Sequence, residues 1–474
     1  MRYFAAALCV CLWLTCAWAA AVPATTETTA ADRASVHLTV YNNNLALVRE
    51  IRQVRLGSGV GELRFMDVAE KILAESVRIQ SLSNPSSLGV LEQNYEFDLL
   101  NPNKLLEKYV GKEITLIQKK FENNSERTEN IKAELLSTNQ GQVWRIGGQI
   151  VVNPSYTSMI FPSLPENLIA HPTLIWLLDN RGPTSQQLEL SYLTDGLGWK
   201  ADYVMVLDES ERSAGLTGWV TLNNECGAAF SDARLKLIAG DVRRVQPRPA
   251  PKGVEYAMVA ARADTGFAEK SFFEYHLYDL QRPATLKNSQ SKQITLLEAS
   301  NVQTQKELKV VGEAFLFQGG TRGVQKQDVQ VHMSFRNSEQ NKLGIPLPAG
   351  TMRVYKRDTD GSQVFVGEDT IDHTPKNEDV TISLGNAFDV VAERKQMDFR
   401  RLAPDLLEIA MQVVLRNHKE SDVMVTVEER LPGDWKILNS SHESEKADAG
   451  TLRFRIAVPK NGESKLEYRA QIRS

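Results

Sequence analysis

Cysteine is almost missing from this sequence once its first residues are set aside. Three of the four cysteines, Cys9, Cys11 and Cys16, stand near the N-terminus, which leaves Cys226 for the rest of the 474 residues. A single thiol cannot close a disulfide within one chain, so burial of apolar surface has to stabilise the fold. The Asn-Asn-Glu sequence before Cys226 and the glycine after it are typical of a turn, and we expect a structural role for this cysteine.

Long apolar runs are also rare. The run at the N-terminus follows Arg2 and ends in the small-x-small pattern Ala17-Trp18-Ala19, so residues 1–19 are predicted to be a secretory signal peptide. No later run reaches the roughly 18–20 apolar residues that a membrane-spanning helix needs, and no transmembrane segment is expected in the mature chain. We therefore expect a protein that is exported and works outside the cytoplasm.

The chain has no strong excess of either charge. Its formal net charge is -4, and removal of Arg2 with the signal peptide leaves 54 basic and 59 acidic residues. A nucleic-acid-binding protein needs a basic face, and no dense cluster of lysine and arginine supplies one here. We expect no nucleic-acid partner.

Sequence motifs of catalysis and metal binding are missing as well. The seven histidines follow no metal-binding spacing, and no Gly-x-Ser-x-Gly motif is present. The densest acidic cluster is Glu368–His373, but on a strand Asp369 and His373 would share one face while Asp372 points to the other. Asp358-Thr359-Asp360-Gly361 resembles the start of a calcium loop, and strand-like flanks favour a hairpin turn instead. We assign no catalytic, cofactor-binding or metal-ligating residue and expect no cofactor.

Alternation of polar and apolar residues is the pattern that the sequence does have. It begins at residues 35–41 and 45–54, is punctuated by asparagine and glycine, and predicts an all-β protein. Residues 33–99 are expected to form an N-terminal β segment. Residues 100–165 contain a helical turn near 104–111 and several short strands, which predicts a small SH3-like barrel with Trp144 and Tyr156 in its core or at its rim.

One unit recurs in the rest of the chain: an alternating strand that ends at an asparagine, a polar turn and another strand. The strands end at Asn224, Asn337 and Asn417, and asparagine ends strands well because its side chain hydrogen-bonds the local backbone. The repetition predicts tandem immunoglobulin-like β-sandwiches over residues 171–300 and 301–474.

Three aromatic residues and two unusual segments belong to the same region. Trp199, Tyr203 and Trp219 are expected in the core rather than in a sugar-binding surface. Residues 243–268 are rich in proline and predict a mobile loop within the first sandwich. Residues 393–405 are expected to link two strands of the second.

Several segments resemble the DUF4139 domain, a bacterial, exported and functionally uncharacterised family. The resemblance extends over residues 170–470, at Ser191-Tyr192-Leu193, Gly198-Trp199-Lys200-Ala201-Asp202-Tyr203, Leu216-Thr217-Gly218-Trp219, Leu235-Lys236-Leu237-Ile238-Ala239-Gly240, Tyr275-His276-Leu277-Tyr278, Pro346-Leu347-Pro348-Ala349-Gly350 and Gly385-Asn386-Ala387-Phe388-Asp389. The related mucoidy-inhibitor family carries a coiled-coil hairpin before this domain, and no sustained heptad repeat occurs here. The resemblance implies a bacterial cell-envelope protein and, for a Gram-negative source, the periplasm, so the expected location is periplasmic or secreted. It names no substrate.

These observations favour an exported, non-enzymatic β-sandwich protein that acts by binding or scaffolding. Its partner would be a protein or polysaccharide of the cell envelope, recognised by loops and sheet edges. A carbohydrate-active enzyme or carbohydrate-binding protein is the alternative, because glycosidases need only two carboxylates and leave little trace in a sequence.

Overall fold

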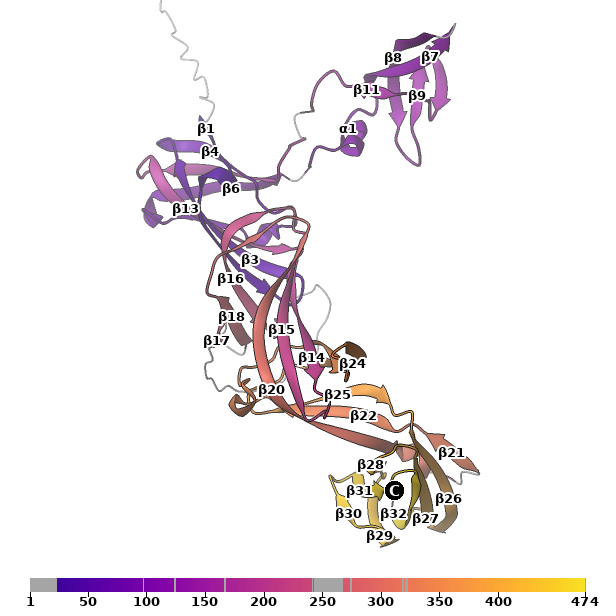
Figure 1. The fold of residues 1–474 in the computed structure, drawn as a ribbon. Helices are drawn as coiled ribbons and strands as arrows, with labels where there is room; N and C mark the ends of the chain where they lie inside the picture. The colour runs from indigo at the N-terminus through magenta and orange to yellow at the C-terminus, as the bar shows by residue number, and fades with distance from the viewer. Residues whose placement is uncertain are drawn as a thin grey trace, which may run out of the picture. The chain divides into compact units, whose positions relative to one another are not determined.

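The structure, a computed structural model, describes residues 24–96, 98–122, 125–165, 168–240, 242, 267–272, 275–317, 319 and 323–473 (Figure 1). Within them the protein is all-β, as the alternation predicts, with α1 (Pro102–Lys108) as an α-helix of two turns. The predicted signal peptide, 1–19, lies outside the described residues. So does the segment 243–268, apart from its last two residues, which begin β17 (Phe267–Phe272).

The chain divides into two compact units. The first comprises Met1–Ser35 and Arg49–Tyr192, and the second comprises Val36–Val48 and Leu193–Ser474. The hairpin of β2 (Arg33–Tyr41) and β3 (Leu45–Arg55) therefore contributes its turn to the second unit and its outer ends to the first.

A four-stranded sheet forms part of the first unit. Its order is β1 (Ala24–Thr28), β4 (Gly59–Met66), β12 (Thr173–Asn180) and β6 (Leu88–Glu96). The alternating residues Leu174, Trp176 and Leu178 are buried, and the Trp176 ring meets Phe65 edge-on at 6.0 Å between centroids. Nearby, β5 (Arg78–Ser81) pairs antiparallel with β13 (Ser185–Asp195).

Residues 102–160 form a second sheet of the first unit with a core of its own. Its order is β10 (Gln149–Val152), β9 (Val143–Ile146), β8 (Ser125–Ser137), β7 (Glu113–Glu122) and β11 (Ser158–Ile160). Trp144 lies fully buried in that core and Tyr156 packs at its margin, as predicted. The hydrogen-bonded order ends at β10 and β11, so this sheet is open where the sequence predicts a small barrel.

The second unit is built of strands that pair mostly antiparallel, with parallel pairs between β14 and β23 and between β20 and β28. The bounds of its strands up to β23 are β14 (Leu197–Leu207), β15 (Ser213–Asn224), β16 (Phe230–Ala239), β18 (Tyr275–Leu280), β19 (Ala284–Leu286), β20 (Gln290–Gly312), β21 (Val324–Gln327), β22 (Gln330–Arg336) and β23 (Gly350–Arg357). The remaining strands are β24 (Gln363–Ile371), β25 (Asp379–Asn386), β26 (Val390–Ala403), β27 (Leu406–Asn417), β28 (Val423–Arg430), β29 (Asp434–Ser440), β30 (Ser444–Lys446), β31 (Thr451–Val458) and β32 (Gly462–Arg473).

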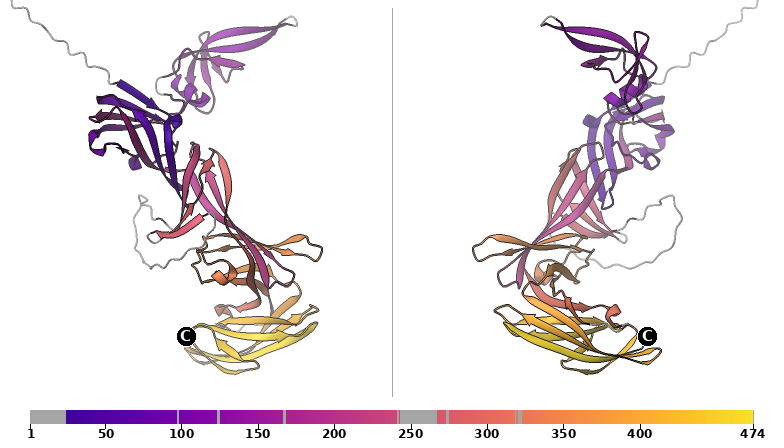
Figure 2. Two further views of the ribbon diagram at one scale, coloured as in Figure 1. Left: turned by 60° about the vertical axis from the view of Figure 1, so that its left-hand side comes forward. Right: turned by 90° about the vertical axis from the view of Figure 1, so that its right-hand side faces the viewer.

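Strand β20 connects two parts of the second unit (Figures 1 and 2). Its first half pairs with β15, and its second half pairs with β22 on one edge and with β28 on the other. On the other side of β15, β14 pairs with β15, β23 runs parallel to β14, and β24 pairs with β23. One 23-residue strand thus belongs to both sheet regions.

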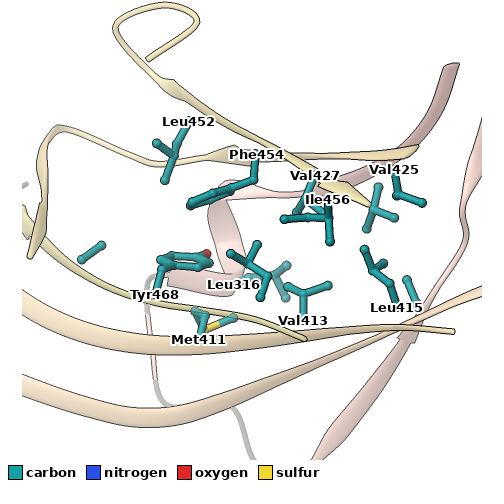
Figure 3. Close-up of a cluster of buried hydrophobic side chains, with 14 of the residues drawn as sticks. Leu316, Met411, Val413, Leu415, Val425, Val427, Leu452, Phe454, Ile456 and Tyr468 are labelled. Atoms are coloured by element: carbon teal, nitrogen blue, oxygen red, sulfur yellow. The ribbon is translucent and has the colours of Figure 1, made fainter. Parts of the chain in front are cut away.

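The C-terminal core lies between two facing sheets. Figure 3 shows Phe454, Val427 and Ile456 from one layer opposite Tyr468 and Val413 from the other. The rings of Phe454 and Tyr468 are 5.3 Å apart. Residues 393–403, predicted as part of a connection, belong instead to β26, and that prediction is wrong. The charged residues in this segment hide its strand pattern in the sequence. In the structure β26 pairs with β27, around a bulge at Met397.

Strand-ending asparagines are a recurrent device in this fold. Asn224 and Asn417 end β15 and β27, and Asn337 follows β22 directly, as the sequence predicts. Each side chain is buried, donates to two or more backbone carbonyls beyond its strand, and accepts a backbone N–H. Asn180 at the end of β12 makes the same type of contacts. It was not predicted, because the repeating unit of strand, asparagine, turn and strand was recognised only later in the chain.

Candidate binding site

The acidic segments singled out in the sequence hold local structure. Asp358–Gly361 forms the turn between β23 and β24, with the Gly361 N–H donating to the Asp358 carbonyl, which confirms the predicted hairpin. In Glu368–His373, Glu368 pairs with Arg353, and His373 Nδ1 accepts the Ala349 N–H. Glu368 and His373 thus contact different partners. Among the described residues, no group of three His, Cys, Asp or Glu side chains is arranged to hold a metal ion.

The predicted core aromatics are divided between core and margin. Trp199 is buried and donates its indole N–H to the Ile238 carbonyl, and Tyr203 is buried and donates its hydroxyl to the Pro348 carbonyl. Trp219 is half-buried, beside a bulge in the pairing of β15 with β20. Cys226 is fully buried, with its sulfur 3.8 Å from the Ala228 carbonyl oxygen, in keeping with the structural role expected of it.

The second unit contains a seam between β24 and β25, two strands that approach each other without joining a common ladder. The Asp369 carboxylate accepts the Ser383 N–H at 2.7 Å. At Gly367, whose φ is +153°, an added Cβ would lie 3.0 Å from the Leu384 carbonyl oxygen. A side chain at this position would push the strands apart, so glycine permits their closest approach.

Beyond this point of closure the seam is open. β24 is the terminal strand in the hydrogen-bonded order of its sheet. Its residues Gln363–Val366 are all exposed, and so are Gly385 and Asn386 at the end of β25. Val364 and Phe365 are each 52% exposed, so two neighbouring apolar side chains of this terminal strand face solvent. Phe365 packs edge-on against Tyr355 across the β23–β24 pair.

A cavity of about 210 Å³ lies at the open end of the seam. Five apolar side chains line it, from β14, β22, β24 and β25: Leu207, Val331, Met333, Val366 and Leu384. The remaining lining residues are polar: Glu211, Lys306, Lys356 and Asn386. The cavity therefore has an apolar wall and one charged side.

Three charged residues form that side. The Glu211 carboxylate accepts hydrogen bonds from Lys306 Nζ at 2.7 Å and from Lys356 Nζ at 2.6 Å. Burial raises the pKa of Glu211, but these two lysines outweigh it and hold the pKa below its ordinary value. With two ammonium groups and one ionised carboxylate, the cluster carries a formal charge of about +1 at neutral pH.

The backbone of Glu211 is itself unusual. Its φ is +60°, in the left-handed region that a residue with a Cβ adopts at a cost of about 1–2 kcal/mol. The turn between β14 and β15 holds it there, because the Glu211 N–H donates to the Asp208 carbonyl and the Glu211 carbonyl accepts the Thr304 hydroxyl. Ten other non-glycine residues of the described ranges also have a positive φ, so the conformation belongs to the turn and marks no site by itself.

A second hollow of the same unit is more polar. An open groove of about 420 Å³ on the β26–β27–β32–β29 sheet is lined by Met397, Glu467 and Arg469 among others. Arg469 Nη1 donates to Asp398 at 3.0 Å and to Glu408 at 2.7 Å. The hydrogen bond from Arg469 lowers the pKa of Asp398, so this carboxyl is ionised and unsuited to act as a general acid near neutral pH.

The β24–β25 seam was not predicted from the sequence. The available signal was the run Val364-Phe365-Val366, three apolar residues in succession where a strand with one buried face alternates. No helix in the described part of the chain is long and apolar enough to cross a membrane. Comparison with protein-family models and with curated proteins gives no match for this chain.

Proposed function

We propose that the protein is a non-enzymatic β-sheet protein of the bacterial cell envelope, periplasmic or secreted, that binds or scaffolds an envelope partner. The observation that carries this proposal is the seam, where a terminal strand exposes adjacent apolar side chains beside a partly apolar cavity. Terminal strands with exposed apolar residues are protected in most soluble proteins, and an unprotected one marks a surface that pairs with another chain.

Other features support a binding role. Asp202 illustrates how a buried carboxylate is held by structural contacts here. It accepts hydrogen bonds from Thr221, Lys200 and Arg353, and they keep its pKa below the ordinary value despite burial. The resemblance to the DUF4139 domain agrees with an exported protein. We retain that family, the immunoglobulin-like sandwiches and the SH3-like character of residues 100–165 as parts of the proposal.

Site-specific photo-crosslinking in intact cells tests this function. A photoreactive amino acid replaces Phe365 in one full-length variant and Asn223, an exposed residue on the inner strand β15, in the control variant. We expect crosslinked products of discrete mass at Phe365 and none at Asn223. Equal crosslinking at both positions, or none at either, would overturn a binding role for this edge.

The carbohydrate alternative is supported by the groove around Arg469. Glu467, Arg469 and the other polar residues that line it could bind hydroxyl groups. The carboxylate of Asp398, which accepts a hydrogen bond from Arg469, is ionised, and this favours binding over hydrolysis. Immobilised cell-wall polysaccharide provides the test. Retention of wild-type protein on it, together with loss of retention in Arg469→Met, would establish carbohydrate binding at this groove. Retention that is unaffected by Arg469→Met, or no retention at all, would exclude this groove.

A further inference from the structure

We infer that the open seam binds an extended peptide as an added strand beside β24, with an acidic side chain of that peptide in the cavity between Lys306 and Lys356. This inference rests on the proposed function and specifies the chemistry of the partner. It follows from three properties of the seam: the size of its cavity, the charge on one side of it and the unpaired edge beside it.

The size of the cavity fits one side chain. At about 210 Å³ it is somewhat larger than a site of about 150 Å³ that holds benzene. Leu207, Met333 and Leu384 on its wall can contact the methylene groups of an entering side chain. A polysaccharide is disfavoured, because most of its hydroxyl groups would lose water against this wall without gaining partners.

The charge of the cavity selects an anion. Each lysine ammonium has three N–H donors, and one from each is directed to Glu211. A second carboxylate beside Lys306 and Lys356 would balance the formal charge of the cluster. Both lysines keep part of their surface exposed, at 31% and 36%, so an incoming group can reach them without unfolding the strands. A basic side chain would meet two like charges and be rejected.

The edge beside the cavity supplies backbone contacts. Gln363–Val366 is exposed on the terminal strand β24, and the end of β25 opposite is exposed as well. A peptide added there would hydrogen-bond to β24 through its main chain and place alternate side chains toward the cavity and away from it. Val364 and Phe365 would then be covered. The closure at Gly367 and Asp369 limits the added strand to the open end of the seam.

Selection from a displayed library of random peptides on the intact mature chain tests this inference. We expect the enriched peptides to carry aspartate or glutamate between apolar residues. Their affinity, measured by fluorescence anisotropy, should fall at least tenfold in Lys356→Gln and be largely kept in Lys356→Arg. The matched control is Lys132→Gln, which also removes a lysine–glutamate pair, with Glu113 of the five-stranded sheet, and should leave the affinity unchanged.

The outcomes separate this inference from the function on which it rests. Three outcomes would each overturn the peptide assignment. They are a failure to enrich any peptide, an enrichment of peptides without acidic residues, and equal binding by wild type and folded Lys356→Gln. Circular dichroism of each variant shows whether it is folded, and Lys356→Arg supplies a second reading should Lys356→Gln unfold. Crosslinking at Phe365 alongside any of these failures would keep the binding role and reject its chemistry.

Discussion

Each unit of this protein buries an arginine completely, and the two sites are built differently. In the first unit, Arg52 bonds Glu50, two residues away on the same strand, and its guanidinium lies 3.7 Å from the centroid of the Phe65 ring. In the second unit, Arg394 on β26 donates to both oxygens of Glu429 on β28 at 2.6 Å. The first pair is local in sequence, whereas the second joins two strands.

The surroundings of the two arginines differ in the same way. Arg52 also donates to the Thr28 carbonyl, and a second arginine, Arg33, pairs with Glu50. Burial lowers the pKa of Arg52. Burial also acts on Arg394, but there the attraction of Glu429 outweighs it and raises the pKa. Arg394 also donates to Gln327, but Glu429 is its one carboxylate partner among the described residues. Two arginines share Glu50 at the first site, so losing Arg52 should cost less than losing Arg394.

The largest effect is expected from Arg394→Met. It leaves the Glu429 carboxylate buried without its cation, which costs about 3–5 kcal/mol in comparable buried pairs. Urea unfolding, followed by hydrogen exchange of β26, should show this loss in the second unit. Arg394→Met with Glu429→Leu should restore much of it, because removal of both charges leaves none unpaired. A double variant as unstable as the single one would contradict this explanation.

Gly312→Ala should be the next most damaging change. A Cβ at Gly312 would lie 1.8 Å from Glu429 Oε2 and 2.8 Å from Arg394 Nη2, so the ion pair has to move. We expect a loss of about 1–3 kcal/mol, as for overpacked cores. Gly215→Ala on β15 is the matched control, since no atom lies within 4 Å of its added Cβ. Equal thermal stability of the two variants would show that the pair has room to relax.

Arg52→Met should lower the free energy of unfolding by less than Arg394→Met does. Arg33 remains to neutralise Glu50, while the Thr28 carbonyl loses its donor. We expect a loss of about 1–2 kcal/mol, measured by hydrogen exchange of β3 during urea unfolding. A loss as large as that of Arg394→Met would mean that sharing among groups gives the first site no protection.

The smallest effect concerns pH, and its sign should differ between the units. Hydrogen bonds from the Thr29 backbone and the Thr28 hydroxyl lower the pKa of Asp32 from 3.8, so its stabilisation is present above that pH and is lost as pH falls below it. Burial raises the pKa of Glu429 above 4.5, so its contribution is largest below that value and declines as pH rises through the folded pKa.

Asp32→Asn and Glu429→Gln separate these contributions. Wild type should exceed Asp32→Asn in free energy of unfolding, and this difference should shrink as pH falls below about 3.8. The free energy of unfolding of wild type, relative to that of Glu429→Gln, should rise as pH falls toward 4.5. Hydrogen exchange of β4, which lies wholly in the first unit, and of β26 in the second reports the two units separately across this range. Parallel trends in both units would contradict the assigned directions.

Much of the local structure could be predicted from the residues. Alternation located β2 and β3, the Asp-Gly turn at 358–361 is a hairpin, and Asn224, Asn337 and Asn417 mark strand ends. Residues 393–403 were missed because charged side chains alternate there with few apolar ones. The cavity could not be foreseen, since Glu211, Lys306 and Lys356 come from separate parts of the chain and carry no common motif.

Strand character was predictable from the sequence, and so were the residues that share one face of a strand, because side chains alternate between its two faces. The folded unit alone shows that β24 and β25 approach without pairing, and that Arg394 meets Glu429. Those contacts depend on which strands become neighbours. That choice is made by the packing of the whole unit, and no single segment contains it.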